Sequence, residues 1–131
     1  MTYGFSKCIG IELLTELHLF SLKILENLNL FKEKSSDKLI LECPDIHLLQ
    51  GDILEYSLDY ENTSVVFMNC KTFSKDLMFQ IANRLKLMPK GVICITSSQL
   101  MTDFDPSWML LKKLRRLMSW GCANLYIHIK I

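Results

Sequence analysis

The sequence lacks several features that would assign it to a specialised class of protein. It has only five glycines and three prolines in 131 residues, and Gly4 and Gly10 are not arranged as a glycine loop. Every apolar stretch ends well short of the ~18 residues of a transmembrane helix, and the first ten residues do not resemble a secretory signal peptide. A net charge of +1 gives no overall field to attract nucleic acid. We therefore expect one soluble core, no membrane insertion, and a location in the nucleus or cytoplasm.

Metal-binding and hydrolase motifs are absent as well. The five cysteines are scattered without a Cys-x-x-Cys pair or a nearby histidine at zinc spacing; they are Cys8, Cys43, Cys70, Cys94 and Cys122. We expect them to be reduced core residues in a reducing compartment, with no metal site. No Gly-x-Ser-x-Gly turn is present. The three histidines, His18, His47 and His128, fall inside predicted helices or strands, so we expect structural roles for them.

What the chain does have is an alternation of two hydrophobic periods. Apolar runs of strand length occupy residues 7–11, 46–49, 64–68 and 91–96. Helical stripes lie between them, formed by Leu13, Leu17, Phe20, Ile24 and Leu28 and by Met78, Ile81, Leu85 and Met88. Ser74 is the predicted N-cap of the second helix, which Pro89 and Gly91 end. The polar residues 32–38 are expected to form a surface loop. This alternation predicts an α/β, Rossmann-like fold with a mostly parallel sheet.

The C-terminal part has a different pattern. Residues 125–131 alternate strictly between apolar and polar, and residues 110–118 mix apolar and basic side chains. We interpret the two as an antiparallel pair of strands at the sheet edge, with a turn at Trp120-Gly121; a helix over residues 108–117 is the alternative. The basic cluster Lys112, Lys113, Arg115 and Arg116 is suited to phosphate or an acidic protein patch, but four such charges are more often a solvated face.

Three polar residues follow predicted strands directly. In open α/β sheets ligands bind beyond the carboxyl ends of the strands, which draws attention to Glu12, Asp52 and Asn69. Glu12 can accept both hydroxyl hydrogens of a ribose, Asp52 can accept an adenine amine, and Asn69 supplies a donor and an acceptor without charge. Each also has a structural interpretation: an acid near a helix N-terminus, a Gly-Asp turn, and a turn asparagine.

Several segments resemble the Dot-type (disruptor of telomeric silencing) histone-lysine methyltransferases and their broader relatives. They are residues 61–73, Met-Pro-Lys-Gly at 88–91, Thr-Ser-Ser at 96–98, Ser-Trp-Gly at 119–121 and Tyr-Ile-His at 126–128. The resemblance runs from about Lys7 to the C-terminus. It implies a class I methyltransferase that uses S-adenosylmethionine, with residues 1–131 forming a single partial domain.

The resemblance also implies roles for particular residues. Glu12 would bind the ribose, Asp52 would contact adenine, and Asn69 would lie beside the reacting methyl group as the catalytic residue. Ile53 stands at a cofactor position that is usually aromatic. The substrate lysine channel would be lined by Phe67, Phe73, Ser97 and Trp120. The chain departs from the family pattern at Ile53, at Cys70 in place of a second asparagine, and at Leu125 in place of an aromatic residue.

Domains of this family begin with a strand and an acidic, glycine-rich turn that approaches the cofactor closely, and nothing in this sequence corresponds to them. The family topology places that strand between those at residues 8–11 and 64–68, so each is expected to lack one hydrogen-bonding neighbour. We therefore expect a partial product, or a domain completed by another chain or segment, with weak or no binding of the cofactor.

Three functions follow from these patterns. The first is methyl transfer to a nitrogen, with a histone or another lysine-bearing protein as the substrate. The second is a catalytically inactive methyltransferase-like module that acts as a protein-interaction scaffold, which the lack of a glycine loop favours. The third is a nicotinamide-dependent Rossmann protein, since an acid after the second strand serves there too; the Phe-Met-Asn and Ser-Trp-Gly segments disfavour it.

Overall fold

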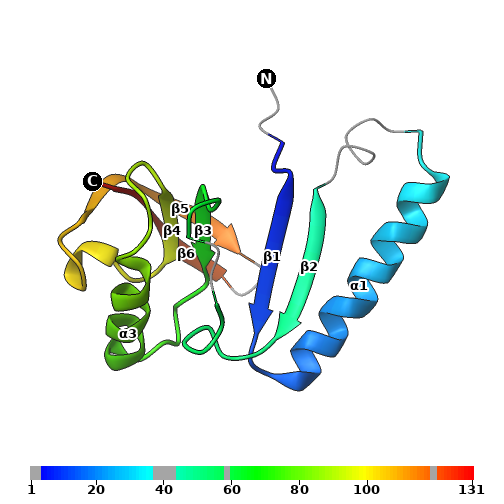
Figure 1. The fold of residues 1–131 in the computed structure, drawn as a ribbon, viewed down its shortest axis with the longest axis horizontal. Coiled ribbons are helices and arrows are strands. Elements are labelled where there is room, and N and C mark those ends of the chain that lie inside the picture. The colour runs from blue at the N-terminus through cyan, green and yellow to red at the C-terminus, as the bar shows by residue number, and fades with distance from the viewer. Residues whose placement is uncertain (1–3, 37–43, 58–59, 119–120) are drawn as a thin grey trace. The chain divides into compact units, whose positions relative to one another are not determined.

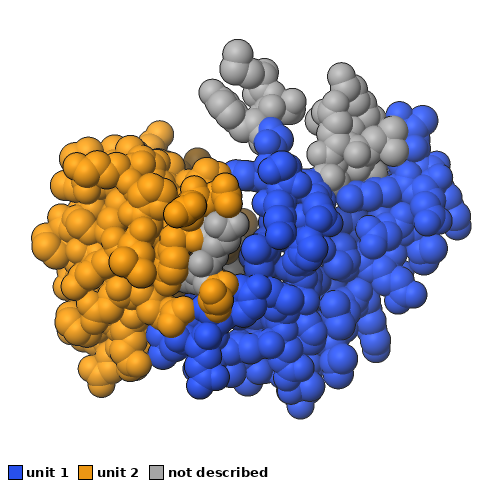
Figure 2. All heavy atoms as spheres, viewed as in Figure 1, with its two compact units in different colours: residues 1–56 blue, residues 57–131 orange. Residues whose placement is uncertain are grey.

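The computed structural model of the protein describes residues 4–36, 44–57, 60–118 and 121–131. The chain divides into two compact units, Met1–Tyr56 and Ser57–Ile131, which are coloured separately in Figure 2. Each unit is described by itself below. The expectation that residues 1–131 form a single partial domain therefore stays a prediction.

The first unit is a strand, a helix and a second strand. Its elements are β1 (Lys7–Glu12), α1 (Thr15–Lys34) and β2 (Asp45–Gln50) (Figure 1). The two strands pair in parallel, with Lys7 opposite Asp45 and Glu12 opposite Gln50. α1 connects them and packs on both, more extensively on β2. The predicted strands and the helix between them are confirmed, and they form a βαβ unit.

α1 differs from the expectation in its length and in the face that it buries. It continues to Lys34, so the first residues of the predicted loop are helical. Lys and Glu favour helices, and Lys32 and Lys34 in the last turn interact favourably with the helix dipole. The predicted stripe is largely exposed: Phe20, for example, is 63% exposed. The least exposed residues of the helix lie on the neighbouring face; they are His18, Ser21, Leu25, Leu28 and Lys32.

The second unit contains a mixed four-stranded sheet. Its elements are β3 (Val65–Met68), α3 (Lys75–Leu85), β4 (Ile93–Ser97), the 3-10 helix η1 (Met101–Asp103), β5 (Trp108–Met118) and β6 (Gly121–Lys130). The strand order is β3-β4-β6-β5. β3 pairs with β4 in parallel, whereas β6 is antiparallel to both β4 and β5.

This arrangement confirms the C-terminal antiparallel pair and corrects two other expectations. The alternative of a helix over residues 108–117 is wrong, because those residues form the edge strand β5. The expectation of a mostly parallel sheet is also wrong for this unit. The reason is that β6 inserts between β4 and β5 and runs opposite to both, so two of the three pairings are antiparallel.

α3 follows the sequence closely. The hydroxyl of Ser74 accepts a hydrogen bond from the backbone N–H of Leu77 at 3.1 Å, as expected for an N-cap. All four residues of the predicted stripe are buried; they are Met78, Ile81, Leu85 and Met88. Gly91 has a φ of +89°, a conformation that glycine adopts without strain. Neither described helix combines the length and apolarity that crossing a bilayer requires.

Among the described residues, the strands at the sheet edges each have a partner on one side only; they are β1 and β2 in the first unit and β3 and β5 in the second. Of the strands described, β1 pairs with β2 alone, and β3 pairs with β4 alone. The expectation that β1 and β3 each lack a neighbour that another strand would supply stays a prediction. At the other end of the second sheet, the edge strand β5 carries the basic cluster, whose four side chains are exposed. Lys113 lies over the ring of Tyr126, with 5.5 Å from its Nζ to the ring centroid.

A buried polar cluster joins the start of β5 to the end of β6. Lys130 Nζ lies 3.3 Å from Asp105 Oδ2, and the two side chains are only 5% and 3% exposed. The same ammonium donates to the Ser107 hydroxyl and lies 5.0 Å from the centroid of the Trp108 ring. Since a charge buried without its partner is costly, this pair ties the ends of the two strands together.

The Asp105 carboxyl makes the stability of the protein depend on pH. Burial alone raises its pKa, but hydrogen bonds from the Ser107 N–H, the Ser107 hydroxyl and Lys130 together lower the pKa below its ordinary value. Asp105 therefore stabilises the folded state above its ordinary pKa of about 3.9, and this contribution is lost as the pH falls from there through the lower pKa of the folded state.

We expect Asp105→Asn to lower the free energy of unfolding at pH 7 by roughly 3 kcal/mol, because Lys130 keeps its charge without a buried partner. The variant should also lose less stability than the parent between about pH 5 and pH 3. Urea unfolding at several pH values measures both effects. Glu61→Gln, at an exposed position of the same unit, is the control. An unchanged acid dependence in Asp105→Asn would contradict the assignment.

Candidate functional site

In the first unit, two carboxylates lie at the carboxyl ends of neighbouring parallel strands. Glu12 is the last residue of β1, and Asp52 lies two residues beyond β2. The backbone N–H of Gly51 donates to the Glu12 carbonyl at 3.0 Å, which joins the two strand ends. The structure therefore brings Glu12 and Asp52 to the same edge of the small sheet, as predicted from the sequence.

Each carboxylate is oriented by a backbone N–H two residues further along the chain. Glu12 Oε1 accepts from Leu14 N at 2.9 Å, at the start of α1, and Asp52 Oδ1 accepts from Leu54 N at 2.8 Å. These are the structural roles that the sequence also allowed, a helix-start acid and a turn aspartate. A carboxylate has two oxygens and about four lone-pair sites, so neither hydrogen bond precludes a ligand. Ile53, which lies between Asp52 and Leu54 in the sequence, is half-buried.

In the second unit, Asn69 and Ser97 stand side by side. β3 and β4 are parallel with Met68 opposite Thr96, so the next residues, Asn69 and Ser97, lie at the same edge of the sheet. The Ser97 hydroxyl donates to Asn69 Oδ1 at 2.7 Å. This bond turns the amide carbonyl of Asn69 toward β4, so the NH₂ group of the same amide points away from Ser97. Ser97 is fully buried, while Asn69 is exposed.

Gln99 completes this arrangement and was not predicted. Its Nε2 donates to the carbonyls of Cys70 and Phe73 at 2.7 and 2.9 Å, so it holds both ends of the loop that follows Asn69. The Thr96 hydroxyl in turn donates to the Gln99 carbonyl, and Ser98 between them has a φ of +68°. The only sequence signal is a glutamine just after a strand end, which does not show that the chain reverses there.

The residues expected to line a substrate channel differ in their exposure to solvent, and one of them is not described by the structure. Phe67 on β3 is 58% exposed, and Phe73 is half-buried before α3. Trp120 lies outside the described residues. Glu12, Asp52 and Ile53 belong to the first unit, whereas Asn69, Phe67, Phe73 and Ser97 belong to the second. The channel and the convergence of the two groups stay predictions.

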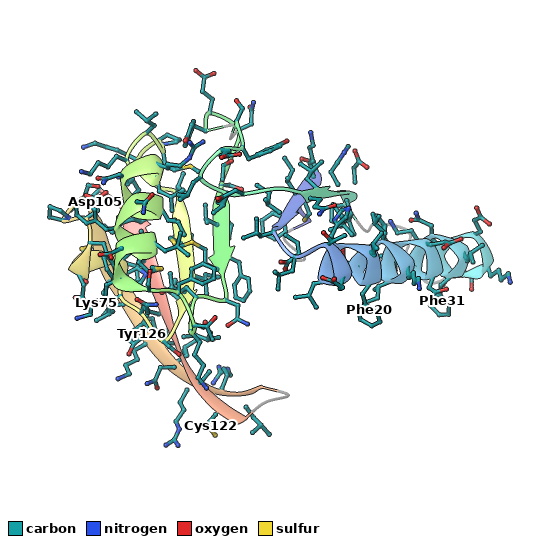
Figure 3. All side chains as sticks on the ribbon, turned by 90° about the horizontal axis from the view of Figure 1, so that it is seen from below. Phe20, Phe31, Lys75, Asp105, Cys122 and Tyr126 are labelled. Atoms are coloured by element: carbon teal, nitrogen blue, oxygen red, sulfur yellow. The ribbon has the colours of Figure 1, made fainter. Side chains whose placement is uncertain are left out.

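An open pocket of about 560 Å³ lies in the second unit next to Gln99. Its lining mixes both signs of charge and an aromatic ring, contributed by Lys75, Asp103 and Tyr126 among others. Figure 3 labels Lys75 at the start of α3 and Tyr126 on β6. The pocket therefore adjoins the loop that Gln99 holds.

Burial favours the neutral forms of His128, Cys70 and Cys94 in the core of the second unit. Burial lowers the pKa of His128, against a backbone hydrogen bond with Cys94 and the charge of Asp103, which raise it. Its Nε2 accepts from the N–H of Met101 at 3.2 Å, a structural role as expected. Burial raises the pKa of the Cys70 thiol, and raises that of Cys94 to about 12 with a further contribution from Cys70.

Comparison with known proteins shows a likeness in fold but none in sequence family. No protein-family model and no curated protein sequence matches the chain. The chain shares its fold with a candidate methylase from Haemophilus influenzae. The two are 18% identical in sequence and superpose with a TM-score of 0.64, over 96% of this chain and 73% of the other. At this identity the likeness concerns the fold alone, and it does not extend to the Dot-type family.

We expect Gln99→Met to loosen the loop that follows Asn69. The substitution removes the side-chain donor that the Cys70 and Phe73 carbonyls share, although the Cys70 carbonyl still accepts from the Phe73 N–H. We expect a cost of roughly 1–2 kcal/mol, so the amides of residues 70–73 should exchange about tenfold faster. Hydrogen–deuterium exchange followed by mass spectrometry measures this. Gln80→Met, at an exposed position of α3, should leave the loop unchanged. Equal protection in parent and Gln99→Met would exclude this role for Gln99.

The cysteines should differ strongly in reactivity. A thiol with a pKa of about 12 is thiolate in about one molecule in ten thousand at pH 8, and burial also blocks access. We expect iodoacetamide at pH 8 to label exposed Cys122 within minutes and to leave Cys70 and Cys94 unlabelled until urea is added. Peptide mapping identifies the labelled thiols, and Cys122→Ser is the control. Rapid labelling of Cys94 in the folded protein would contradict its burial.

Proposed function

We propose that this protein is an S-adenosylmethionine-dependent methyltransferase that acts on a lysine amine of a protein substrate. One observation carries the proposal: within a fold shared with a candidate methylase, Glu12, Asp52 and Asn69 stand at or just beyond the carboxyl ends of β1, β2 and β3. Ligands bind at this edge of α/β sheets. The convergence of the three residues on one adenosyl group is part of the proposal.

The first unit supplies acceptors suited to the adenosyl part of the cofactor. The Glu12 carboxylate is held by Leu14 N and can accept two ribose hydroxyls, and the Asp52 carboxylate, held by Leu54 N, can accept the adenine amine. Both are oriented before any ligand arrives, which lowers the entropy cost of binding. Ile53 follows Asp52 and offers an apolar surface to the base.

The second unit supplies the group beside the reacting methyl. When bound, the cofactor would supply a methyl group from its sulfonium. A neutral lysine amine would form the new C–N bond as the S–C bond breaks and leaves a neutral thioether, and the methylated ammonium would then lose a proton to solvent. Asn69 would orient the amine, because Ser97 fixes the amide carbonyl, whose second lone pair can accept an N–H of the amine and leaves the amine lone pair free to react. The exposed Phe67, with Phe73 and Trp120, would surround the amine with aromatic surface. Catalysis would rest on positioning in a dry channel rather than on a strong base.

The choice of a lysine in a histone-like protein rests on the sequence resemblance to the Dot-type enzymes. That resemblance includes Phe67, Asn69 and the Ser-Trp-Gly segment, and it is weakened at Cys70 and Leu125. A second candidate function is that of a module that binds a protein partner without catalysis. The observation that favours it is the departure from the family pattern within the chain, at Cys70 and Leu125.

A labelling experiment separates enzyme from scaffold. The chain is incubated with tritiated S-adenosylmethionine and mixed nuclear and cytoplasmic proteins, and acid-stable label on lysine is measured. We expect Asn69→Ala to lower the rate about 10²-fold through misplacement of the amine. Asn83→Ala, at an exposed position of α3, should leave the rate unchanged.

Two other outcomes contradict the proposal. Equal labelling by Asn69→Ala and the parent would remove Asn69 from the mechanism. Absence of labelling by the parent, although isothermal titration shows that it binds S-adenosylmethionine, would favour the non-catalytic module.

A further inference from the structure

The exposed side of α1 carries an apolar ridge. We define the ridge as Leu17, Phe20, Ile24, Leu28 and Phe31. Leu17, Phe20, Ile24 and Phe31 are 52%, 63%, 54% and 59% exposed, and Leu28 is half-buried at the border with the face on the sheet. At about 100° per residue these positions fall within a sector of about 80°. Figure 3 shows Phe20 and Phe31 projecting from the same side of α1. Large apolar side chains gathered in this way mark an interaction surface.

The spacing of the ridge is the same in both directions. From Leu17 the steps are three, four, four and three residues, so Ile24 is the centre of a palindrome. If two α1 helices pack antiparallel about a two-fold axis at Ile24, each Ile24 meets its copy. Phe20 then lies opposite Leu28, and Leu17 opposite Phe31. A self-complementary surface of this kind is what an isologous contact requires.

The charges beside the ridge agree with the same pairing. Glu16 and Lys34 are both exposed and are five helical turns apart, so they lie on the same flank of the ridge. In an antiparallel pair with two-fold symmetry each flank faces the same flank of the partner, so Glu16 of one copy lies within one turn of Lys34 of the other. Two equivalent ion pairs result. Lys23, on the same flank next to the centre, faces Lys23 of the other copy, and the flexible stem of each lets the two charges separate into water.

We propose that α1 is a homodimerisation surface and that its occupant is the α1 ridge of a second copy of this chain, packed antiparallel about Ile24. The pairing of Glu16 with Lys34 across the two-fold axis supports a second copy, because an unrelated partner would not need opposite charges at the two ends of one flank. The proposal does not depend on methyl transfer, since none of the residues involved belongs to the candidate site.

Cross-linking tests the geometry directly. Sedimentation equilibrium of the intact chain should show a reversible monomer–dimer equilibrium. Ile24→Cys should form a symmetric disulfide under mild oxidation, and peptide mapping separates it from products of the native cysteines. Leu30→Cys, at a position 48% exposed on another side of the helix, should not cross-link at a comparable rate. Comparable rates for the two variants, or a parent that stays monomeric at high micromolar concentration, would overturn the proposal.

A charge exchange tests the direction of packing. Glu16→Lys should weaken dimerisation about tenfold, because two attractive pairs become repulsive. Adding Lys34→Glu to the same chain reverses both charges and should restore the parent affinity. Circular dichroism confirms that each variant keeps its helix content. If the double variant is as weak as Glu16→Lys, or if Glu16→Lys dimerises like the parent, the antiparallel arrangement is wrong.

Discussion

The parallel pairing of β3 with β4 is the constraint on which the second unit depends. Because the two strands run in the same direction, Asn69 and Ser97 leave the sheet at the same edge, and the loops that follow them must share the space there. Gln99 occupies that space, and its side chain donates hydrogen bonds to two carbonyls of the loop that follows Asn69. An antiparallel pairing would have put Asn69 and Ser97 at opposite ends, and neither the fixed amide nor the held loop would exist.

The sequence predicted the elements with a clear hydrophobic period. The strands at β1 to β4 are short apolar runs, and α3 combines a Ser74 cap with a stripe that is fully buried. The C-terminal alternation likewise predicted β6 and its antiparallel partner. These signals are local, because each depends on residues within one or two turns of each other. The positions of Glu12, Asp52 and Asn69 at strand ends followed from the same local reasoning.

Features that depend on contacts distant in the sequence were not predictable. The insertion of β6 between β4 and β5 makes the sheet mixed, and no periodicity encodes the order of strands. The same applies to Gln99, and to Lys130 meeting Asp105. α1 shows a different limit: the large apolar residues of the predicted stripe, such as Phe20, are exposed, so the hydrophobic pattern identified a helix but not which face lies on β1 and β2. His18 and Ser21 lie on that face although they are polar.

The two edges of the four-stranded sheet are unlike each other. β5 ends the sheet with Lys112, Lys113, Arg115 and Arg116, and cationic side chains on an edge strand repel a second strand that approaches it. β3 ends the other side with Val-Val-Phe-Met, which carries no charge. Growth of the sheet by addition of further strands is therefore directional, discouraged at one boundary and admitted at the other.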